Sequence, residues 1–170
     1  STSTNKSMEI FGAAWQDYTT RLKNNWNNVV EIDDTVIVPG DVSWGMTTEE
    51  ALPDLLLLNS LNGKKIIGKG NHDFWWTTQT KLSNTLKVNR IDTINFLYNN
   101  AYLTENFIIA GTRGWYNEAT TGMTENRPDY QKIINREAIR LRLSLEAAQK
   151  LRGDSETPII VFFHFPPVWN

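Results

Sequence analysis

The sequence predicts a layered α/β domain with helices on the faces of its β-sheet. Two observations lead to this fold class. Segments with apolar residues three and four positions apart, typical of amphipathic helices, alternate with short continuous apolar runs. Such short runs are typical of parallel strands that are buried on both faces. Because 170 residues suffice for one sizeable core, we expect residues 1–170 to form a single domain.

Three elements are predicted in the first third of the chain. Apolar side chains recur every four positions over residues 10–26, which indicates a helix. The β-branched run Thr35–Val38 predicts a buried parallel strand. Thr47 and Glu50 have the spacing of a capping box and predict the start of a leucine-rich helix that ends near residue 61.

The remaining elements continue this alternation. A short strand over residues 65–67 and a polar helix over residues 77–86 come next. Residues 93–110 predict short strands, some of them antiparallel. A long helix then starts near Pro128 and ends at Gly153, because proline suits the first helical position and glycine suits the C-terminal cap. A final apolar run over residues 158–163 predicts another buried strand.

The composition excludes several classes of protein. Hydrophobic residues make up 40% and charged residues 21%, which is ordinary for a globular protein and excludes a disordered chain or a membrane bundle. The formal charge of −2 gives no bulk attraction to nucleic acid or anionic lipid. The absence of cysteine excludes disulfides and thiolate metal sites. The N-terminus has no signal-peptide features, so we expect a cytoplasmic protein.

Side chains that can bind a metal follow three of the predicted strands. They are Asp41, the run Asn71-His72-Asp73, and His164. Ligand sites in α/β sheets lie at the carboxyl ends of strands, so these residues can converge on one spot. Asp, Asn and His all offer donors that suit a divalent cation. Taken alone, Gly40-Asp41 is more typical of a turn and His164 of a hydrogen-bonded core residue, whereas Gly70-Asn71-His72-Asp73 is a more specific motif.

These motifs, in this order and spacing, resemble the inner motifs of the calcineurin-like metallophosphoesterases. The flanking stretches Pro-Gly-Asp-Val-Ser-Trp and Gly-Asn-His-Asp-Phe-Trp-Trp are similar to a bacterial branch of predicted phosphohydrolases. The resemblance covers most of the chain. It implies that family's four-layer αββα fold, which is a layered, mixed β-sandwich flanked by helices.

The resemblance implies a phosphoesterase that uses two divalent metal ions, which would be Mn, Fe or Zn. Asp41 would bridge both cations, and Asn71 and His164 would bind the second one. His72, positioned by Asp73, would stabilise or protonate the leaving group. A hydroxide between the metals would attack the phosphorus of a phosphomonoester or phosphodiester.

One departure from the family pattern concerns the missing outer motifs. The family also has an Asp-x-His motif after its first strand and a Gly-His-x-His motif near its end, and both are absent because His72 and His164 are the only histidines. We therefore expect that the complete protein contains both motifs and that this chain carries half of the active site.

Residues 1–170 expressed alone are accordingly predicted to be poorly soluble, to bind at most one divalent metal weakly, and to hydrolyse a phosphodiester no faster than buffer with metal. An unpaired strand edge would cause the poor solubility. A monomeric, two-metal chain whose activity is lost on His72→Ala would contradict this prediction, and would turn attention to Asp73, Glu118 and Glu125 as ligands.

Two residues near the motifs are candidates for substrate binding. Arg113, in a glycine-flanked loop, could clamp a phosphate oxygen, although a structural ion pair is equally consistent with the sequence. Trp44, like Trp75, Trp76 and Trp115, lies beside a motif loop and could stack on a nucleobase or simply pack at the rim of the core.

Two alternative functions stay open from the sequence. Lys132, Arg136 and Arg140 form a basic stripe on the last helix, which would suit a nuclease if it lay beside the metals but is more typical of a solvated helix face. The second alternative is a scaffold that keeps the fold and binds a partner protein without metal.

Overall fold

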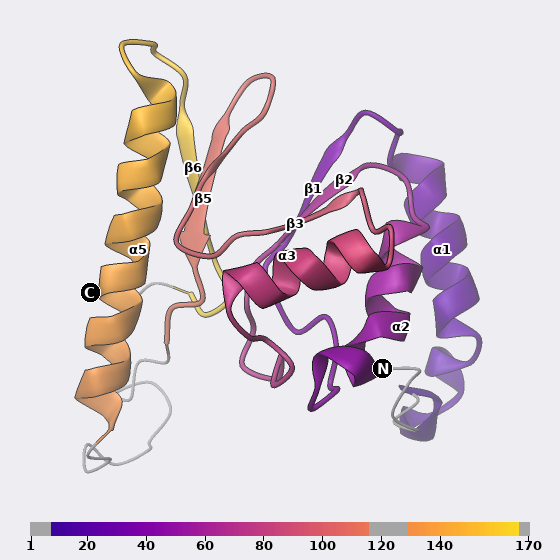
Figure 1. The fold of residues 1–170 in the computed structure, drawn as a ribbon. Helices are drawn as coiled ribbons and strands as arrows, with labels where there is room; N and C mark the ends of the chain where they lie inside the picture. Colours follow the sequence, from indigo (N-terminus) through magenta and orange to yellow (C-terminus); the bar gives the residue numbers. More distant parts are fainter. Residues whose placement is uncertain (1–7, 116–128, 167–170) are drawn as a thin grey trace. The chain divides into compact units, whose positions relative to one another are not determined.

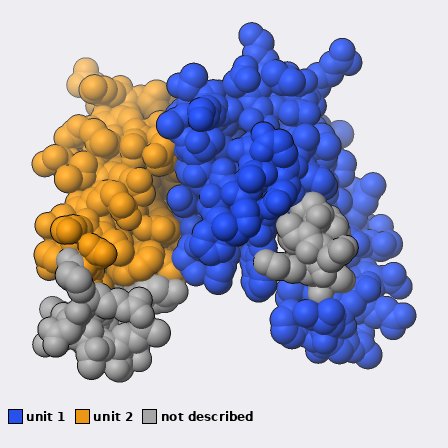
Figure 2. Space-filling view, turned by 60° about the horizontal axis from the view of Figure 1, so that its bottom comes forward, with its two compact units in different colours: residues 1–96 blue, residues 97–170 orange. Residues whose placement is uncertain are grey.

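The structure is a computed structural model, and it describes residues 8–115 and 129–166. The described chain forms two compact units, which we call unit 1 (residues 1–96) and unit 2 (residues 97–170) (Figure 2). Both units combine helices with a β-sheet, so the predicted mixed α/β class is confirmed (Figure 1). In the part of the chain that the structure describes, no helix has the length and apolar composition needed to cross a bilayer.

Unit 1 is built on a parallel three-stranded sheet with the order β1-β2-β3. The register pairs Val38 with Ile67, and Ile67 with Phe96, so the three strands end level with one another. This alignment brings the segments that follow β1 and β2 to the same edge of the sheet. The elements of the unit are β1 (Thr35–Val38), β2 (Lys64–Ile67), β3 (Ile94–Phe96), α1 (Tyr18–Val29), α2 (Thr48–Asn59) and α3 (Gln79–Val88).

The helix predicted over residues 10–26 is shorter than expected. Two 3-10 helices, η2 (Met8–Phe11) and η3 (Ala13–Trp15), precede α1. Gly12 has a φ of 116° and Asp17 a φ of 50°, and neither angle is compatible with a continuous α-helix. The regular spacing of apolar residues therefore continues across two positions at which the helix is interrupted.

The predicted start of α2 is confirmed, with one difference in the cap. The Thr47 side chain accepts a hydrogen bond from the Glu50 N–H at 3.3 Å, as an N-cap residue should. The Glu50 carboxylate, however, accepts from the N–H of Met46 at 2.6 Å rather than closing back on Thr47. Ala51 and Leu55 follow on the buried side of the helix, and both are fully buried.

The described residues of unit 2 form a mixed sheet and a long helix, with elements β4 (Tyr102–Leu103), β5 (Ile108–Thr112), β6 (Ile159–Phe163) and α5 (Tyr130–Arg152). The sheet order is β4-β5-β6, and β4 is antiparallel to β5, as predicted, whereas β6 is parallel to it. Helix α5 packs along β5 (Figure 1). It ends at Gly153 as expected, while Pro128 lies outside the described residues.

Not all of the strands predicted to be buried are buried. Three of the four residues of β2 and four of the five residues of β5 are buried. The residues of β1 and β6 are only half-buried or exposed. β2 and β5 are the central strands of the two sheets, and β1 and β6 lie at the edges. An apolar run predicts a strand well, but its burial depends on the neighbours that the fold supplies.

A fully buried lysine lies at the start of β2. The ammonium of Lys65 donates hydrogen bonds to the carbonyl oxygens of Leu61 at 2.6 Å and Gly63 at 2.7 Å, just beyond the C-terminus of α2. Burial lowers the pKa of the Lys65 ammonium, although the carboxylate of Asp92 opposes this effect. The two hydrogen bonds and the charge of Asp92 favour the ammonium form, but the desolvation cost is larger.

This buried charge predicts a pH dependence of stability. Between the lowered pKa of folded Lys65 and the ordinary value of 10.5, the unfolded chain binds more protons than the folded one. The free energy of unfolding contributed by this group therefore rises as the pH rises through that window. Urea denaturation across the alkaline range should show this rise in the wild type relative to Lys65→Met, which cannot titrate. If the free energy of unfolding changed with pH in the same way in both proteins, the prediction would be wrong.

Candidate active site at the ends of two parallel strands

The loops that follow β1 and β2 pack directly against each other. The N–H of Gly68 donates to the carbonyl of Val38 at 2.8 Å, which extends the strand pairing into the loops. A Cβ atom at Gly40 would collide with the backbone of Gly70, and one at Gly70 would collide with Asp41. Gly40 also has a φ of 142°, which other residues rarely adopt. Glycine at both positions therefore allows the two motifs to touch.

Asp73 is the centre of the hydrogen-bond network between these loops. Its carboxylate is fully buried and accepts five hydrogen bonds, from the backbone N–H groups of Gly70 (2.7 Å), Asp41 (2.8 Å), Val42 (2.9 Å) and Ser43 (3.2 Å), and from the indole N–H of Trp75 (3.0 Å). One buried charge thus fixes the backbone of both motifs. The role of Asp73 in positioning His72 stays a prediction, and the five groups that donate to its carboxylate do not include the His72 ring.

The imidazole of His72 pairs with Asp41 instead. Nδ1 of the ring lies 2.9 Å from Asp41 Oδ2, and the His72 backbone N–H donates to Asp41 Oδ1 at 3.0 Å. Asn71 Nδ2 lies 3.2 Å from His72 Nε2. These contacts are satisfied together when Nδ1 carries the proton and Nε2 accepts from the Asn71 amide. The side chains of His72 and Asp41 are 44% and 30% exposed, so a ligand in solution can reach both.

Sequence reasoning missed a second buried link that supports the site. Ser43 is buried directly after the Gly-Asp-Val run and donates from its hydroxyl to the buried carboxylate of Asp54 on α2 at 2.5 Å. The same hydroxyl accepts from the N–H of Gly45 at 3.2 Å. Asp54 stands between Ala51 and Leu55 on the buried side of α2. A polar residue on an otherwise apolar stripe is a signal that could have identified it.

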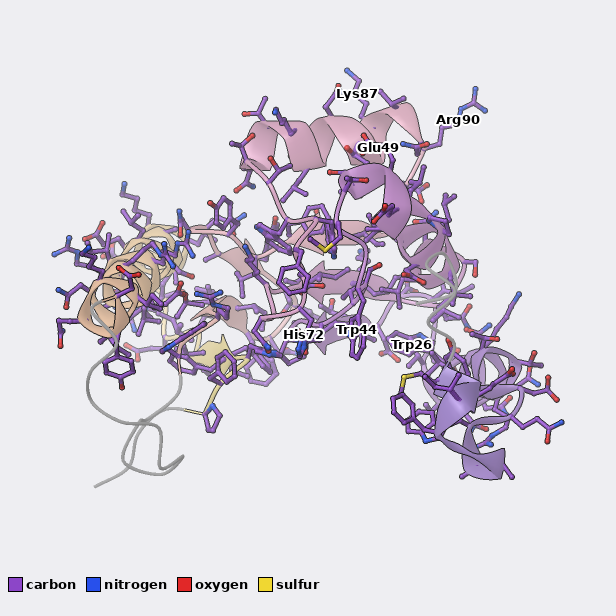
Figure 3. All side chains as sticks on the ribbon, turned by 90° about the horizontal axis from the view of Figure 1, so that it is seen from below. Trp26, Trp44, Glu49, His72, Lys87 and Arg90 are labelled. Atoms are coloured by element: carbon purple, nitrogen blue, oxygen red, sulfur yellow. The ribbon has the colours of Figure 1, made fainter. Side chains whose placement is uncertain are left out.

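The aromatic residues of the two loops divide into a buried pair and an exposed pair. Trp75 and Trp76 are buried and contact Phe96, so they pack in the core. Trp44 and Phe74 remain 38% and 55% exposed. The centre of the Trp44 ring lies 5.3 Å from that of the His72 ring, and both side chains are labelled in Figure 3. The centre of the Phe74 ring lies 6.3 Å from that of His72, with the two rings edge to face.

The other predicted site residues belong to unit 2. His164 follows β6, and its ring lies 4.7 Å from that of Phe165 in an edge-to-face arrangement. Arg113 follows β5 and forms an ion pair with Glu137 on α5 at 3.0 Å, while its guanidinium lies 4.5 Å from the centre of the Trp115 ring. Burial lowers the pKa of the Arg113 guanidinium, and Glu137 counteracts that effect. Of the two alternatives that the sequence left open for Arg113, the structure thus contains the structural ion pair.

The predicted basic stripe on α5 is largely tied to the same glutamate. Glu137 is buried, and its carboxylate lies 2.8 Å from Arg140 and 4.0 Å from Arg136. It also accepts a hydrogen bond from the Thr112 hydroxyl at 2.8 Å. Lys132 and Arg136 are the exposed members of the stripe, and Lys132 pairs with Asp129 at 3.4 Å. Sequence analysis missed Glu137, whose position on the inner side of α5 among arginines was the available signal.

Comparison with known proteins agrees with the motif geometry. Residues 11–170 match the family model of the calcineurin-like phosphoesterases. The chain belongs to the calcineurin-like phosphoesterase family. Its fold is similar to the crystal structure of phosphopantetheinyl hydrolase (PptH) from Mycobacterium tuberculosis, with a TM-score of 0.51 and 15% sequence identity over 94% of this chain. The match spans 66% of that hydrolase. No curated protein matches the chain.

The side chains at this site include the chemical types of metal ligand that a divalent cation accepts, but only a small number of them. Within unit 1 the two loops bring the carboxylate of Asp41 and the amide of Asn71 to the imidazole of His72, and carboxylate and amide oxygens are donors that such cations accept. No group of three or more His, Cys, Asp or Glu side chains suited to a metal occurs within residues 8–115 and 129–166. Glu118 and Glu125 lie outside those residues.

Proposed function

We propose that this calcineurin-like phosphoesterase is a metal-dependent hydrolase of phosphomonoesters or phosphodiesters. The observation that carries the proposal is the placement of Asp41, Asn71 and His72 at the level ends of two parallel strands. Strand ends of this kind are where α/β proteins bind their ligands. Membership of the family gives the same reaction class independently.

Asp41, Asn71 and His164 are the residues that would hold divalent metal in this proposal, with Asp41 as the ligand for both cations. Divalent cations, when bound, supply the Lewis acid that activates the attacking water and neutralises charge on the phosphate. An amide ligand suits this task, because Asn71 adds a donor oxygen without a further negative charge to repel the substrate. Mn, Fe and Zn all accept this mixed set of oxygen and nitrogen donors.

His72 has the proposed role of stabilising or protonating the leaving group. Its partly exposed ring is accessible to substrate, and the adjoining loops hold its backbone through Asp73. The contact with Asp41 orients the ring, and a doubly protonated imidazole would keep this contact through Nδ1–H while its second proton, on Nε2, serves the leaving group. Trp44 is a proposed substrate contact beside His72. For Arg113, a phosphate contact would have to share the guanidinium with Glu137.

A nuclease is less well supported than a small-molecule phosphoesterase. Two of the three basic residues in the predicted stripe approach Glu137, so the stripe offers less free positive charge than its sequence suggested. Nucleic-acid backbones are bound mainly through such free charges. The scaffold alternative requires that the full-length protein bind no metal.

A panel of phosphate esters tests the proposal on the full-length protein. Phosphomonoesters and phosphodiesters would be assayed with manganese, nickel, zinc and magnesium, with a chelator as the control. We expect turnover with at least one metal and its loss on chelation. Metal-independent turnover, or none with any metal and ester, would overturn the proposal.

A further inference from the structure

Two exposed aromatic side chains flank the imidazole that would face the leaving group. The ring of Trp44 lies 5.3 Å from that of His72 at an interplanar angle of 36°, which is a tilted stack. The centre of the Phe74 ring lies 6.3 Å from that of His72 at an interplanar angle of 74°, so the two rings meet edge to face. The labelled side chains of Trp44 and His72 are neighbours in Figure 3. We call these two residues, Trp44 and Phe74, the aromatic rim.

The aromatic rim is not needed to fill the core. In the run Phe74-Trp75-Trp76, the two tryptophans turn inward against Phe96, while Phe74 keeps 55% of its surface exposed. Met46, in the same loop as Trp44, is 62% exposed and adds further apolar surface. Large apolar side chains grouped on a protein surface often mark a binding site.

The backbone beneath the rim is held in place. Ser43, the neighbour of Trp44, donates its N–H to Asp73 and its hydroxyl to Asp54. Phe74 follows Asp73 directly, and its own N–H donates to the carbonyl of His72 at 2.9 Å. Both aromatic residues therefore extend from loops that the buried Asp73 carboxylate fixes, and their backbone is held before any ligand arrives. Such preorganisation lowers the cost of binding.

We propose that the aromatic rim binds a planar aromatic ring in the leaving group of the substrate. This inference rests on the proposed function, because it takes His72 as the residue that faces the leaving group. An aromatic ring in the leaving group can stack on an exposed ring of the aromatic rim, whereas an alkyl chain gains only apolar contact. The substrate class is thus a phosphate ester of a ring-bearing alcohol or phenol, held by its ring next to His72.

The test compares two non-hydrolysable ligands that differ in the ring. Isothermal titration calorimetry on the metal-loaded, full-length protein would measure Kd for phenylphosphonate and for methylphosphonate. We expect phenylphosphonate to bind about tenfold more tightly, which is a typical gain from one stacked ring. Trp44→Leu and Phe74→Leu keep apolar bulk but lose the ring, so each should reduce the preference, Trp44→Leu to about twofold or less. Because both variants lie in the rim, Phe74→Leu still provides the test if Trp44→Leu fails to fold.

Trp15→Leu is the matched control. Trp15 is an exposed tryptophan of the same unit, but it contacts Tyr18 and not His72, so its loss should leave the preference unchanged. The proposal is overturned if the wild type binds the two phosphonates equally, if it binds neither, or if the folded rim variants keep the full preference. Hydrolysis of methyl phosphate, which has no ring, is measured separately. Turnover without ring preference would refute the rim alone, and ring preference without turnover would refute the proposed function alone.

Discussion

Replacement of His72 by alanine should lower the turnover of an alkyl phosphate ester by about 10²- to 10⁴-fold, the range that a positioned proton donor contributes. The metal content should change little, because His72 is proposed to serve the leaving group and not the cation. The loss should be much smaller for p-nitrophenyl phosphate, since that leaving group departs readily without a proton. Steady-state kinetics with both esters, together with metal analysis of the variant, measure these effects.

The other histidine provides the comparison for this prediction. His164→Ala should lower metal content along with turnover, and should affect both esters alike, because His164 is a proposed ligand. If His72→Ala lost its metal, or if its turnover fell equally for the two esters, the role of leaving-group assistance would be wrong.

Asp73→Asn should lower the free energy of unfolding by about 4 kcal/mol, a large effect for one substitution. The side chains have nearly the same shape, but the amide nitrogen of asparagine would face backbone N–H groups that now donate to the carboxylate. Each buried donor left without an acceptor costs about 1–3 kcal/mol. Urea denaturation of both proteins at neutral pH gives the difference directly.

Asp33→Asn is the control for this substitution, because Asp33 is exposed and should change stability by less than about 0.5 kcal/mol. A comparably small effect at Asp73 would show that its five hydrogen bonds do not hold the two loops together.

The strands of the parallel sheet were predictable because their signal is local. Thr35–Val38 and residues 65–67 are short β-branched or apolar runs, and both form strands with nearly the predicted bounds. The first helix was predicted too long, because apolar periodicity does not report the backbone angles of Gly12 and Asp17. Strand burial was predicted in part, since it depends on whether a strand lies at the centre or the edge of its sheet.

The residues of the site were easier to predict than their contacts. Asp41, Asn71 and His72 follow parallel strands, so their proximity was expected from topology alone. The pairing of His72 with Asp41 and the burial of Asp73 beneath both loops depend on how tightly Gly40 and Gly70 allow the loops to approach. No pattern in the sequence encodes that distance. The ion pair of Arg113 with Glu137 likewise forms between segments that only the folded unit brings together.

The central claim is that the Gly40-Asp41 and Gly70-Asp73 loops form a metal-dependent phosphoester-hydrolysing site, and metal content tests it most directly. Purified full-length protein would be dialysed against the activating metal and analysed by mass spectrometry beside Asp41→Asn and the exposed control Asp33→Asn. Asparagine tolerates the left-handed backbone of Asp41, whose φ is 58°, so the substitution removes charge without forcing the chain. We predict about two metal ions per chain in the wild type and in Asp33→Asn, and well under one in Asp41→Asn. A wild type with well under one metal ion, or an Asp41→Asn variant that keeps its full complement, would contradict the claim.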